Sequence, residues 1–382
     1  MKVLILTTVM APYRVNLFNE LGKYCDLTVC FEQENDRSRD VGWYVKATPH
    51  FECIPLKHWD RPVSQIKFDI LTKLNIKKFD LAVAYEYSTM TGILFILACQ
   101  FKKIPYLINI DGAFIERHFM RDLIKKFLIS RAAGCLANGE HAKQYFLAYG
   151  AKLESIYFHH FTSLYEKDIL DSPLKKQDKD HLRRELNLIE PSRIVMTVGR
   201  FIRSKRIEVL LSAWQEMPSG WLLLVVGSGE LEAEYQAQVS ELGLGNVRFT
   251  GHLESSRLKE LYLASDLFVI PTESDVWGLV VNEAMAAGLP VISTDRCIAG
   301  LELIRDDYNG CVVPVGDSAL LAVSIKRILL DEDQLSTFSM NALHTIQDHT
   351  YESIARSHMH AIQQTLSRKA RVPECQSGGP HC

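Results

Sequence analysis

The sequence lacks several of the patterns that assign a protein to a class at once. It contains no run of 18 uninterrupted apolar residues, so no membrane-spanning helix is predicted. Seven of its nine cysteines are scattered among apolar runs with no CxxC or Cys/His spacing, so we predict buried free thiols and no metal site; they are Cys25, Cys30, Cys53, Cys99, Cys135, Cys297 and Cys311. The loop after the first apolar segment has no GxGxxG fingerprint, which leaves no support for a dinucleotide site there. We also predict no cofactor and no nucleic-acid partner.

Charge and length narrow the class further. The formal net charge is −3, but residues 1–165 carry 21 Lys and Arg against 16 Asp and Glu, whereas the remainder carries 22 against 30. This split suggests that the first half faces an anionic surface. At 382 residues the chain is too long for one ordinary core and predicts two domains. Because Met1 leads straight into a strand without a signal peptide, we expect a cytoplasmic protein, with the inner face of the plasma membrane as an alternative.

The rest of the sequence is organised around residues 271–295, PTESDVWGLVVNEAMAAGLPVISTD. Apolar runs at residues 266–270 and 290–294 are typical of buried strands. Between them a helix is predicted to begin near Gly278. A loop that leads from a strand into a helix opening on small residues leaves unpaired N–H groups and a positive dipole end, which bind phosphate well.

Acidic and polar residues bracket this loop. Ser274 and Asp275 are residue types that satisfy free amides at a helix start. Glu283 lies about 7 Å along the predicted helix from Gly278, so Asp275 and Glu283 could meet two parts of one ligand. Glu273 offers a third carboxylate two residues before Asp275.

Strands and helices alternate along the chain, which is typical of doubly wound α/β domains. In the first half we expect strands at 2–8, 26–31, 51–55, 79–85, 105–110 and 134–138, and helices at 15–23, 66–74, 89–102, 116–133 and 139–149. In the second half we expect further strands at 193–199, 221–226, 247–253 and 309–314, and helices at 207–215, 231–242, 319–330 and 351–367. The predicted domains are 1–170 and 171–350, followed by a helix that crosses back to the first domain at 351–369 and a disordered tail at 370–382.

Polar residues follow two further predicted strands. Arg200 and Lys205 lie in the loop after the strand 193–199, and Asp111 ends the strand 105–110. Ligands of open α/β sheets gather at the carboxyl ends of strands, which makes all three candidates for a site. The alternatives are a simple turn acid at Asp111 and solvated cations in the loop.

The pattern DVWGLVVNEAMAAGLPVI resembles the signature of retaining GT-B glycosyltransferases of family 4, and Arg200 with Lys205 is similar to the family's GRxxxxK element. The resemblance implies two Rossmann-like doubly wound domains facing a cleft. In that family two glutamates stand with seven residues between them; the first usually contacts the donor sugar and the second the ribose. Glu283 matches the second position, and Asp275 falls on the first with one methylene fewer. Glu273 remains an alternative for the first acid.

The resemblance also implies roles for the other residues. Arg200 and Lys205 would hold the nucleotide diphosphate and balance the growing charge of the leaving group in place of a metal. Asp111 would face the donor sugar and the acceptor. The remaining donor-binding residues would be His252 and Leu253 at the base, and Gly278, Leu279 and Val280 at the start of the helix.

The implied reaction moves a hexose or deoxyhexose from a nucleotide-diphosphate donor, for which we favour UDP, to an acceptor hydroxyl with retention. The implied acceptor is a growing lipid-linked glycan of capsule, exopolysaccharide or O-antigen type. Three alternatives stay open: a nucleotide-sugar epimerase of the same architecture, a hydrolase that uses Asp275 and Glu283 as an acid pair, and a non-catalytic nucleotide-sugar sensor or activating subunit.

The segment Glu116–Ala133 is predicted to be a basic amphipathic helix. Its apolar stripe is Phe119, Leu123, Ile124, Phe127 and Leu128, and its cations are Arg117, Arg121, Lys125, Lys126 and Arg131. Such a helix lies on anionic lipid headgroups in many proteins. The alternative is that the stripe packs on the domain core while the cations are solvated.

Overall fold

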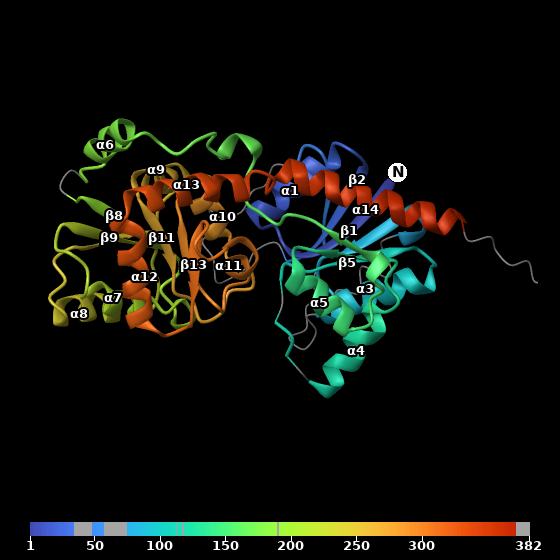
Figure 1. The fold of residues 1–382 in the computed structure, drawn as a ribbon. Helices are drawn as coiled ribbons and strands as arrows, with labels where there is room; N and C mark the ends of the chain where they lie inside the picture. The colour runs from blue at the N-terminus through green and yellow to red at the C-terminus, as the bar shows by residue number, and fades with distance from the viewer. Residues whose placement is uncertain (34–47, 57–74, 113, 117, 189–190, 372–382) are drawn as a thin grey trace, which may run out of the picture. The chain divides into compact units, whose positions relative to one another are not determined.

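The computed structural model describes residues 1–33, 48–56, 75–112, 114–116, 118–188 and 191–371 (Figure 1). The chain divides into two α/β units, one made of Met1–Phe161 with Tyr351–Cys382 and the other of Thr162–Thr350. We expected the boundary at 170/171. The segment 162–170 instead contacts the second unit, where the Leu170 amide donates to the Ala286 carbonyl at 3.0 Å. The helix expected at 66–74 and the tail after residue 371 lie outside the described residues.

The first unit is built on a seven-stranded sheet in the order β3-β2-β1-β4-β5-β6-β7, with parallel pairing throughout. The chain runs outward from β1 in one direction and from β4 in the other, so the switch point lies between these two strands. Only the short edge strand β7 was not expected among the strands described. The strands are β1 (Lys2–Val9), β2 (Asp26–Gln33), β3 (Glu52–Pro55), β4 (Leu81–Ala84), β5 (Tyr106–Asn109), β6 (Gly134–Ala137) and β7 (Ile156–Phe158).

Helices cover this sheet, and local chemistry fixes where they begin. Pro12 begins α1, where its missing N–H leaves no bond unmade. The Thr89 hydroxyl accepts from the Gly92 amide at 3.0 Å and caps α3. The long α14 packs against α1 and reaches β6 and β7 (Figure 1). The helices described in this unit are α1 (Pro12–Gly22), α3 (Met90–Phe101), α4 (Phe119–Ile129), α5 (Glu140–Ala148) and α14 (Tyr351–Arg371).

The apolar stripe of α4 is largely uncovered within its unit. Phe119 is 79% exposed, Leu123 53%, Ile124 45% and Phe127 40%, whereas Leu128 is 1% exposed and belongs to the core. Core packing therefore accounts for one residue of the predicted stripe and leaves four to solvent.

The second unit is built on a six-stranded parallel sheet in the order β10-β9-β8-β11-β12-β13. Its strands are β8 (Arg193–Val198), β9 (Trp221–Val226), β10 (Val247–Gly251), β11 (Leu267–Ile270), β12 (Val291–Thr294) and β13 (Gly310–Val313). Its helices are α6 (Lys176–Glu185), α7 (Ile207–Trp214), α8 (Glu232–Glu241), α9 (Ser255–Ala264), α10 (Leu279–Ala286), α11 (Ile298–Leu303), α12 (Ser318–Leu330) and α13 (Glu332–Ile346). The sequence did not lead us to expect α9, α11 or α13.

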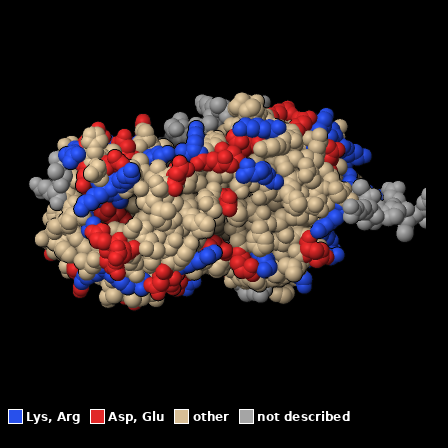
Figure 2. All heavy atoms as spheres, turned by 45° about the horizontal axis from the view of Figure 1, so that its top comes forward, with Lys and Arg blue, Asp and Glu red and all other residues tan. Residues whose placement is uncertain are grey.

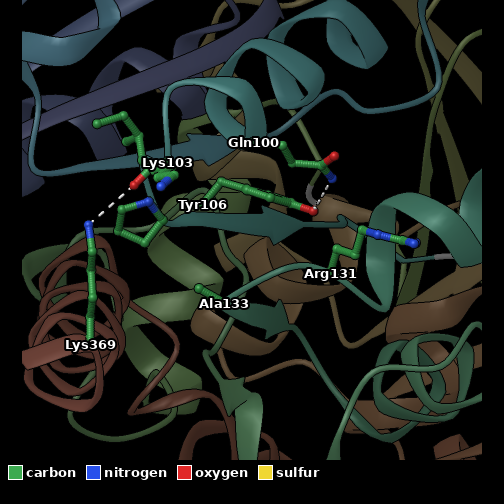
Figure 3. Close-up of a pocket in the computed structure, with 8 residues that line it drawn as sticks. Gln100, Lys103, Tyr106, Arg131, Ala133 and Lys369 are labelled. Carbon is green, nitrogen blue, oxygen red and sulfur yellow. Dashed lines mark hydrogen bonds between the residues drawn. The ribbon is translucent and has the colours of Figure 1, made fainter. Parts of the chain in front are cut away.

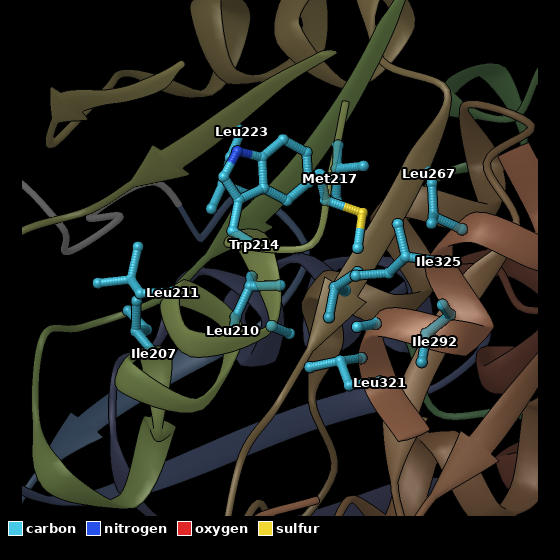
Figure 4. Packing of buried hydrophobic residues seen from close by; sticks show 14 of the residues in the cluster. Ile207, Leu210, Leu211, Trp214, Met217, Leu223, Leu267, Ile292, Leu321 and Ile325 are labelled. Carbon is cyan, nitrogen blue, oxygen red and sulfur yellow. The ribbon is translucent and has the colours of Figure 1, made fainter. Parts of the chain in front are cut away.

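The core of the second unit joins the sheet to α7 and α12. Trp214 of α7 is fully buried, and Figure 4 shows it beside Met217 and Leu223, with Ile325 of α12 near Leu267. Burying side chains of this size contributes roughly 1.5–3 kcal/mol each. This packing fixes the strands from whose carboxyl ends the candidate site residues project.

A cavity of about 330 Å³ lies in the first unit, at the amino ends of β5 and β6 (Figure 3). Lys103, Arg131 and Lys369 line it, and they stand at the carboxyl ends of α3, α4 and α14. Lys369 Nζ donates to the Lys103 carbonyl at 3.2 Å. Cations at helix carboxyl ends offset the negative end of the helix dipole, so these three stabilise the fold.

A buried polar cluster lies at the opposite edge of this sheet. Arg14, after β1, is ion-paired with Asp111, after β5, and its guanidinium lies 4.3 Å from the centroid of the Tyr85 ring. Tyr85 Oη is 2.6 Å from His358 Nε2 of α14, and the Ile354 carbonyl is 2.9 Å from His358 Nδ1. These bonds tie α14 to the ends of β1, β4 and β5.

Because His358 is buried, we expect the free energy of unfolding to fall in acid. Burial lowers the pKa of His358 from 6.5 to about 4, so the unfolded chain binds this proton first. Stability contributed by the neutral ring should be complete above pH 6.5 and be lost as the pH falls toward 4. The test is the free energy of unfolding by denaturant, measured at a series of pH values. His358→Gln should reduce its fall between pH 6.5 and 4, whereas His360→Gln, at an exposed position of the same helix, should not. An identical acid limb in His358→Gln would contradict the assignment.

Candidate functional site

The loops after β8 and β11 meet at the carboxyl edge of the second sheet. These strands are neighbours, and the chain proceeds from them in opposite directions, so they define the switch point of this unit. The Glu273 amide donates to the Ser204 carbonyl at 2.8 Å, and the Thr272 hydroxyl donates to the same carbonyl at 2.7 Å. Three hydrogen-bonding groups therefore hold the two predicted site loops against each other.

An ion pair joins the two loops at this point. Lys205 Nζ is bonded to the Asp275 carboxylate, and both side chains are about one-fifth exposed. Arg200 lies two residues after β8 and is exposed, with no ion pair to any residue that the structure describes. Glu273 points elsewhere: its carboxylate is 54% exposed and lies 3.9 Å from Arg206 Nε. The structure thus brings Lys205 and Asp275 together and separates Glu273 from them.

The GSG turn after β9 supports the Arg200 loop. Gly227 has φ +136°, and a Cβ there would lie 1.9 Å from the Gly199 carbonyl oxygen. A Cβ on Gly229 would lie 2.6–2.9 Å from the backbone of Phe201. These glycines therefore admit the chain's own backbone, and the Phe201 amide donates to the Ser228 carbonyl at 2.8 Å.

The start of α10 differs from the expected arrangement. We expected Ser274 and Asp275 to cap it, but Gly278 is the N-cap residue, with φ +99°, and no side chain caps this helix. A Cβ on Gly278 would lie 2.8 Å from Cys297 Sγ. A left-handed glycine redirects the chain here, and the main-chain N–H groups of Leu279 and Val280, at the start of the helix, have no partner within it.

Glu283, on the first turns of α10, is held at both carboxylate oxygens. Ser163 Oγ donates to Oε1 at 3.1 Å, and Tyr262 Oη donates to Oε2 at 3.2 Å. Burial raises the pKa of Glu283, and the two hydrogen bonds oppose that shift. The carboxylate is therefore partly removed from water while remaining oriented by two hydroxyl groups.

Two of the other predicted residues lie farther from this loop pair within the second sheet. His252 and Leu253 follow the edge strand β10, which β9 separates from β8; His252 is exposed and Leu253 is half-buried. Asp111 lies in the first unit, bonded to Arg14. Among the described residues, no group of three or more His, Cys, Asp and Glu side chains is arranged to hold a metal ion.

Sequence reasoning missed Tyr262, Ser163 and Arg14. Tyr262 belongs to α9, which was not anticipated, and Ser163 was assigned to the end of the first domain. No local sequence motif marks either residue, because each contacts Glu283 from a segment that is distant in the sequence. Arg14 carries a usable signal, since it lies on the first turn of α1, the helix that follows β1 at the switch point of its sheet.

Comparison with known proteins finds similar sequences for the second unit. Residues 178–345 match the model of the family Glycosyl transferases group 1. An uncharacterized glycosyltransferase of Methanocaldococcus jannaschii is 31% identical over 165 residues, 42% of each chain. The lipopolysaccharide core biosynthesis glycosyltransferase LpsE of Rhizobium meliloti is 33% identical over 150 residues, 39% of this chain and 43% of its own. The matched part of the chain thus spans less than half the length of these relatives.

The whole chain is similar to solved structures. The crystal structure of Anabaena HepE in complex with UDP and glucose aligns with a TM-score of 0.72 at 19% identity, covering 97% of this chain and all of that one. This likeness confirms the predicted fold class, two Rossmann-like α/β units with parallel sheets, as in GT-B glycosyltransferases.

The half-buried Glu283 carboxylate is expected to lower the free energy of unfolding of the second unit at neutral pH. Its pKa is raised on folding, so the folded state disfavours the ionised acid, and stability falls as the pH rises through the interval above 4.5. Glu283→Gln should therefore be more stable than the parent at pH 7.5, with the difference shrinking toward pH 4 in urea unfolding; each tenfold change in proton affinity corresponds to about 1.4 kcal/mol. Glu241→Gln, at an exposed position on α8, should show no such trend. A less stable Glu283→Gln at pH 7.5 would contradict this reading.

Proposed function

We propose that this protein belongs to the glycosyl transferases group 1 family, whose model residues 178–345 match, and that it transfers a sugar from a nucleotide-diphosphate donor to an acceptor hydroxyl. The observation that carries the proposal is the Lys205–Asp275 pair at the switch point, beside the uncapped start of α10. It places a cation, a carboxylate and free main-chain donors where a diphosphate and its sugar would bind together.

In this proposal the diphosphate binds between Arg200, Lys205 and the amides of Leu279 and Val280. Helix amino ends and cations both favour the negative charge that grows as the sugar–phosphate bond breaks. The cations balance that charge, so the reaction requires no metal ion. Binding of the diphosphate draws Lys205 away from Asp275 and leaves that carboxylate free to accept a hydrogen bond.

We assign Asp275, rather than Glu273, as the acid that contacts the donor sugar. Asp275 is bonded to Lys205, whereas Glu273 lies near Arg206. Glu283, deeper on α10, contacts the ribose, and His252 with Leu253 lies at the base. Asp111 of the first unit contacts the acceptor.

The reaction proceeds with retention at the anomeric carbon. The bond from that carbon to the acceptor oxygen forms on the face from which the diphosphate leaves. The departing phosphate oxygen takes the proton of the acceptor hydroxyl, which balances the charges without an enzyme nucleophile.

Similar proteins support the choice of donor and acceptor. The HepE structure contains UDP and glucose, and LpsE is described as a lipopolysaccharide core enzyme. We accordingly propose a UDP-sugar donor and a lipid-linked glycan acceptor.

We further propose that α4 brings the protein to an anionic bilayer. No helix that the structure describes is both long and apolar enough to cross a membrane. On α4, however, exposed Phe119 and Leu123 accompany exposed Arg121 and Lys126, as in helices that lie in the lipid headgroup layer. On the face shown in Figure 2, Lys and Arg are interspersed with Asp and Glu, without a broad area of one sign.

The donor site is tested by removing one side chain from each loop. Lys205→Ala and Asp275→Asn should each lower sugar release from UDP-, GDP-, ADP- or dTDP-sugars about a hundredfold, the order expected when one charge-stabilising group is lost. Glu273→Gln, in the same loop, is the matched control and should retain most activity. Full activity in Lys205→Ala would remove this loop from the site, and a severe loss in Glu273→Gln alone would transfer the role of Asp275 to Glu273.

The membrane contact is tested by reversing charge on α4. Each basic residue near an anionic surface is worth about 1 kcal/mol, so Arg121→Glu with Lys126→Glu should weaken sedimentation with phosphatidylglycerol-containing vesicles at least about thirtyfold. Lys125 is left unchanged because its ammonium lies 5.2 and 5.0 Å from the ring centroids of Tyr145 and Tyr149.

The matched charge control is Lys175→Glu with Lys176→Glu, two exposed positions of the second unit. Leu123→Ser should also weaken vesicle binding while leaving stability unchanged, since Leu123 is already exposed. Equal sedimentation of the α4 variant and the control would exclude this helix as the contact.

A further inference from the structure

The Glu283 carboxylate is supported by two elements that the proposed function leaves without a role. Tyr262 comes from α9, and Ser163 comes from the segment that opens the second unit. Each hydroxyl meets a different oxygen, Ser163 at Oε1 and Tyr262 at Oε2, at 3.1 and 3.2 Å. The plane of the carboxylate is thereby fixed from two sides.

Both supports are themselves held in place. Tyr262 is 3% exposed, and its ring lies 5.7 Å from that of Phe268 on β11. Burial and the neighbouring Glu283 raise the pKa of Tyr262 well above 10, so its hydroxyl keeps the proton that it donates. The segment carrying Ser163 is anchored farther along α10, where the Leu170 amide donates to the Ala286 carbonyl at 3.0 Å.

The bonding capacity of the carboxylate shows what remains for a ligand. An ionised carboxylate offers about four lone-pair positions, two on each oxygen. Tyr262 and Ser163 take one position on each, so one position remains on each oxygen. Two acceptors held side by side in one plane match two hydroxyls on adjacent carbons.

We propose that Tyr262 and Ser163 are positioning residues that fix Glu283 to accept both hydroxyls of a ribose, and that they thereby select ribonucleotide over 2′-deoxyribonucleotide donors. The inference rests on the proposed function, which assigns Glu283 to the ribose. It adds the two residues that make this acid discriminate and predicts that thymidine-linked (2′-deoxy) donors are disfavoured.

Equilibrium binding to the full chain tests the inference. The probes are UDP, GDP and ADP, each paired with its 2′-deoxy analogue, together with dTDP. The parent should bind its preferred ribonucleotide at least about tenfold more tightly than the deoxy form, as expected for a hydrogen bond to a charged acceptor. Tyr262→Phe and Ser163→Ala should each lower that ratio about threefold or more, mainly by weakening the ribonucleotide. Ser163→Thr keeps the hydroxyl and should restore the ratio.

A control separates positioning from general stability. Tyr106→Phe removes a buried hydroxyl of the first unit, which donates to the Leu128 carbonyl at 2.8 Å, and should leave the binding ratio unchanged. Thermal unfolding of every variant shows whether the second unit is intact. A merely structural role for Tyr262 would lower stability and weaken both nucleotides equally, which would overturn the inference.

Glu283→Gln distinguishes the inference from the proposed function. If this variant loses the ratio while Tyr262→Phe and Ser163→Ala keep it, the acid reads the ribose without these supports and the inference alone fails. If Glu283→Gln keeps the ratio, or none of the nucleotides binds the parent, the proposed role of Glu283 fails with it. Tighter binding of dTDP than of any ribonucleotide would likewise overturn the inference.

Discussion

The contact between the loops after β8 and β11 is the constraint on which the rest of the candidate site depends. A single carbonyl, that of Ser204, accepts from both Glu273 and Thr272, and Lys205 lies against Asp275 beside it. The glycines after β9 exist to let the first of these loops approach, since a Cβ at Gly227 would overlap the Gly199 carbonyl. The sheet edge is therefore organised before any ligand arrives, as binding with little loss of entropy requires.

The same region shows a balance between stability and binding. A half-buried acid on α10 and an ion pair with partial solvent access are less favourable than apolar residues of similar size. Two hydroxyl donors and a cation moderate that cost without removing it. Such groups are expected where a polar ligand supplies the missing partners.

Sequence alone predicted most of the scaffold because both sheets are parallel and buried. Their strands form continuous apolar runs between loops, which sequence patterns identify well. Lys205, Asp275 and Glu283 could be named as site candidates because each lies in or next to a recognisable loop between a strand and a helix. What it did not predict is contact between distant residues: Ser163 and Glu283 are 120 positions apart, and Arg14 and Asp111 are 97 apart. The cap of α10 was wrong for a local reason, since the left-handed turn at Gly278 replaces the side-chain caps that Ser274 and Asp275 offered.

The return of α14 to the first unit bears on how the chain is made. The second unit is continuous in sequence, whereas the first is completed only by residues after Tyr351, which pack on α1 and bring His358 to Tyr85. Because synthesis proceeds from the amino end, every residue of the second unit is added before Tyr351. The first unit therefore cannot be completed until the second has been synthesised, and α1 lacks its partner helix until then.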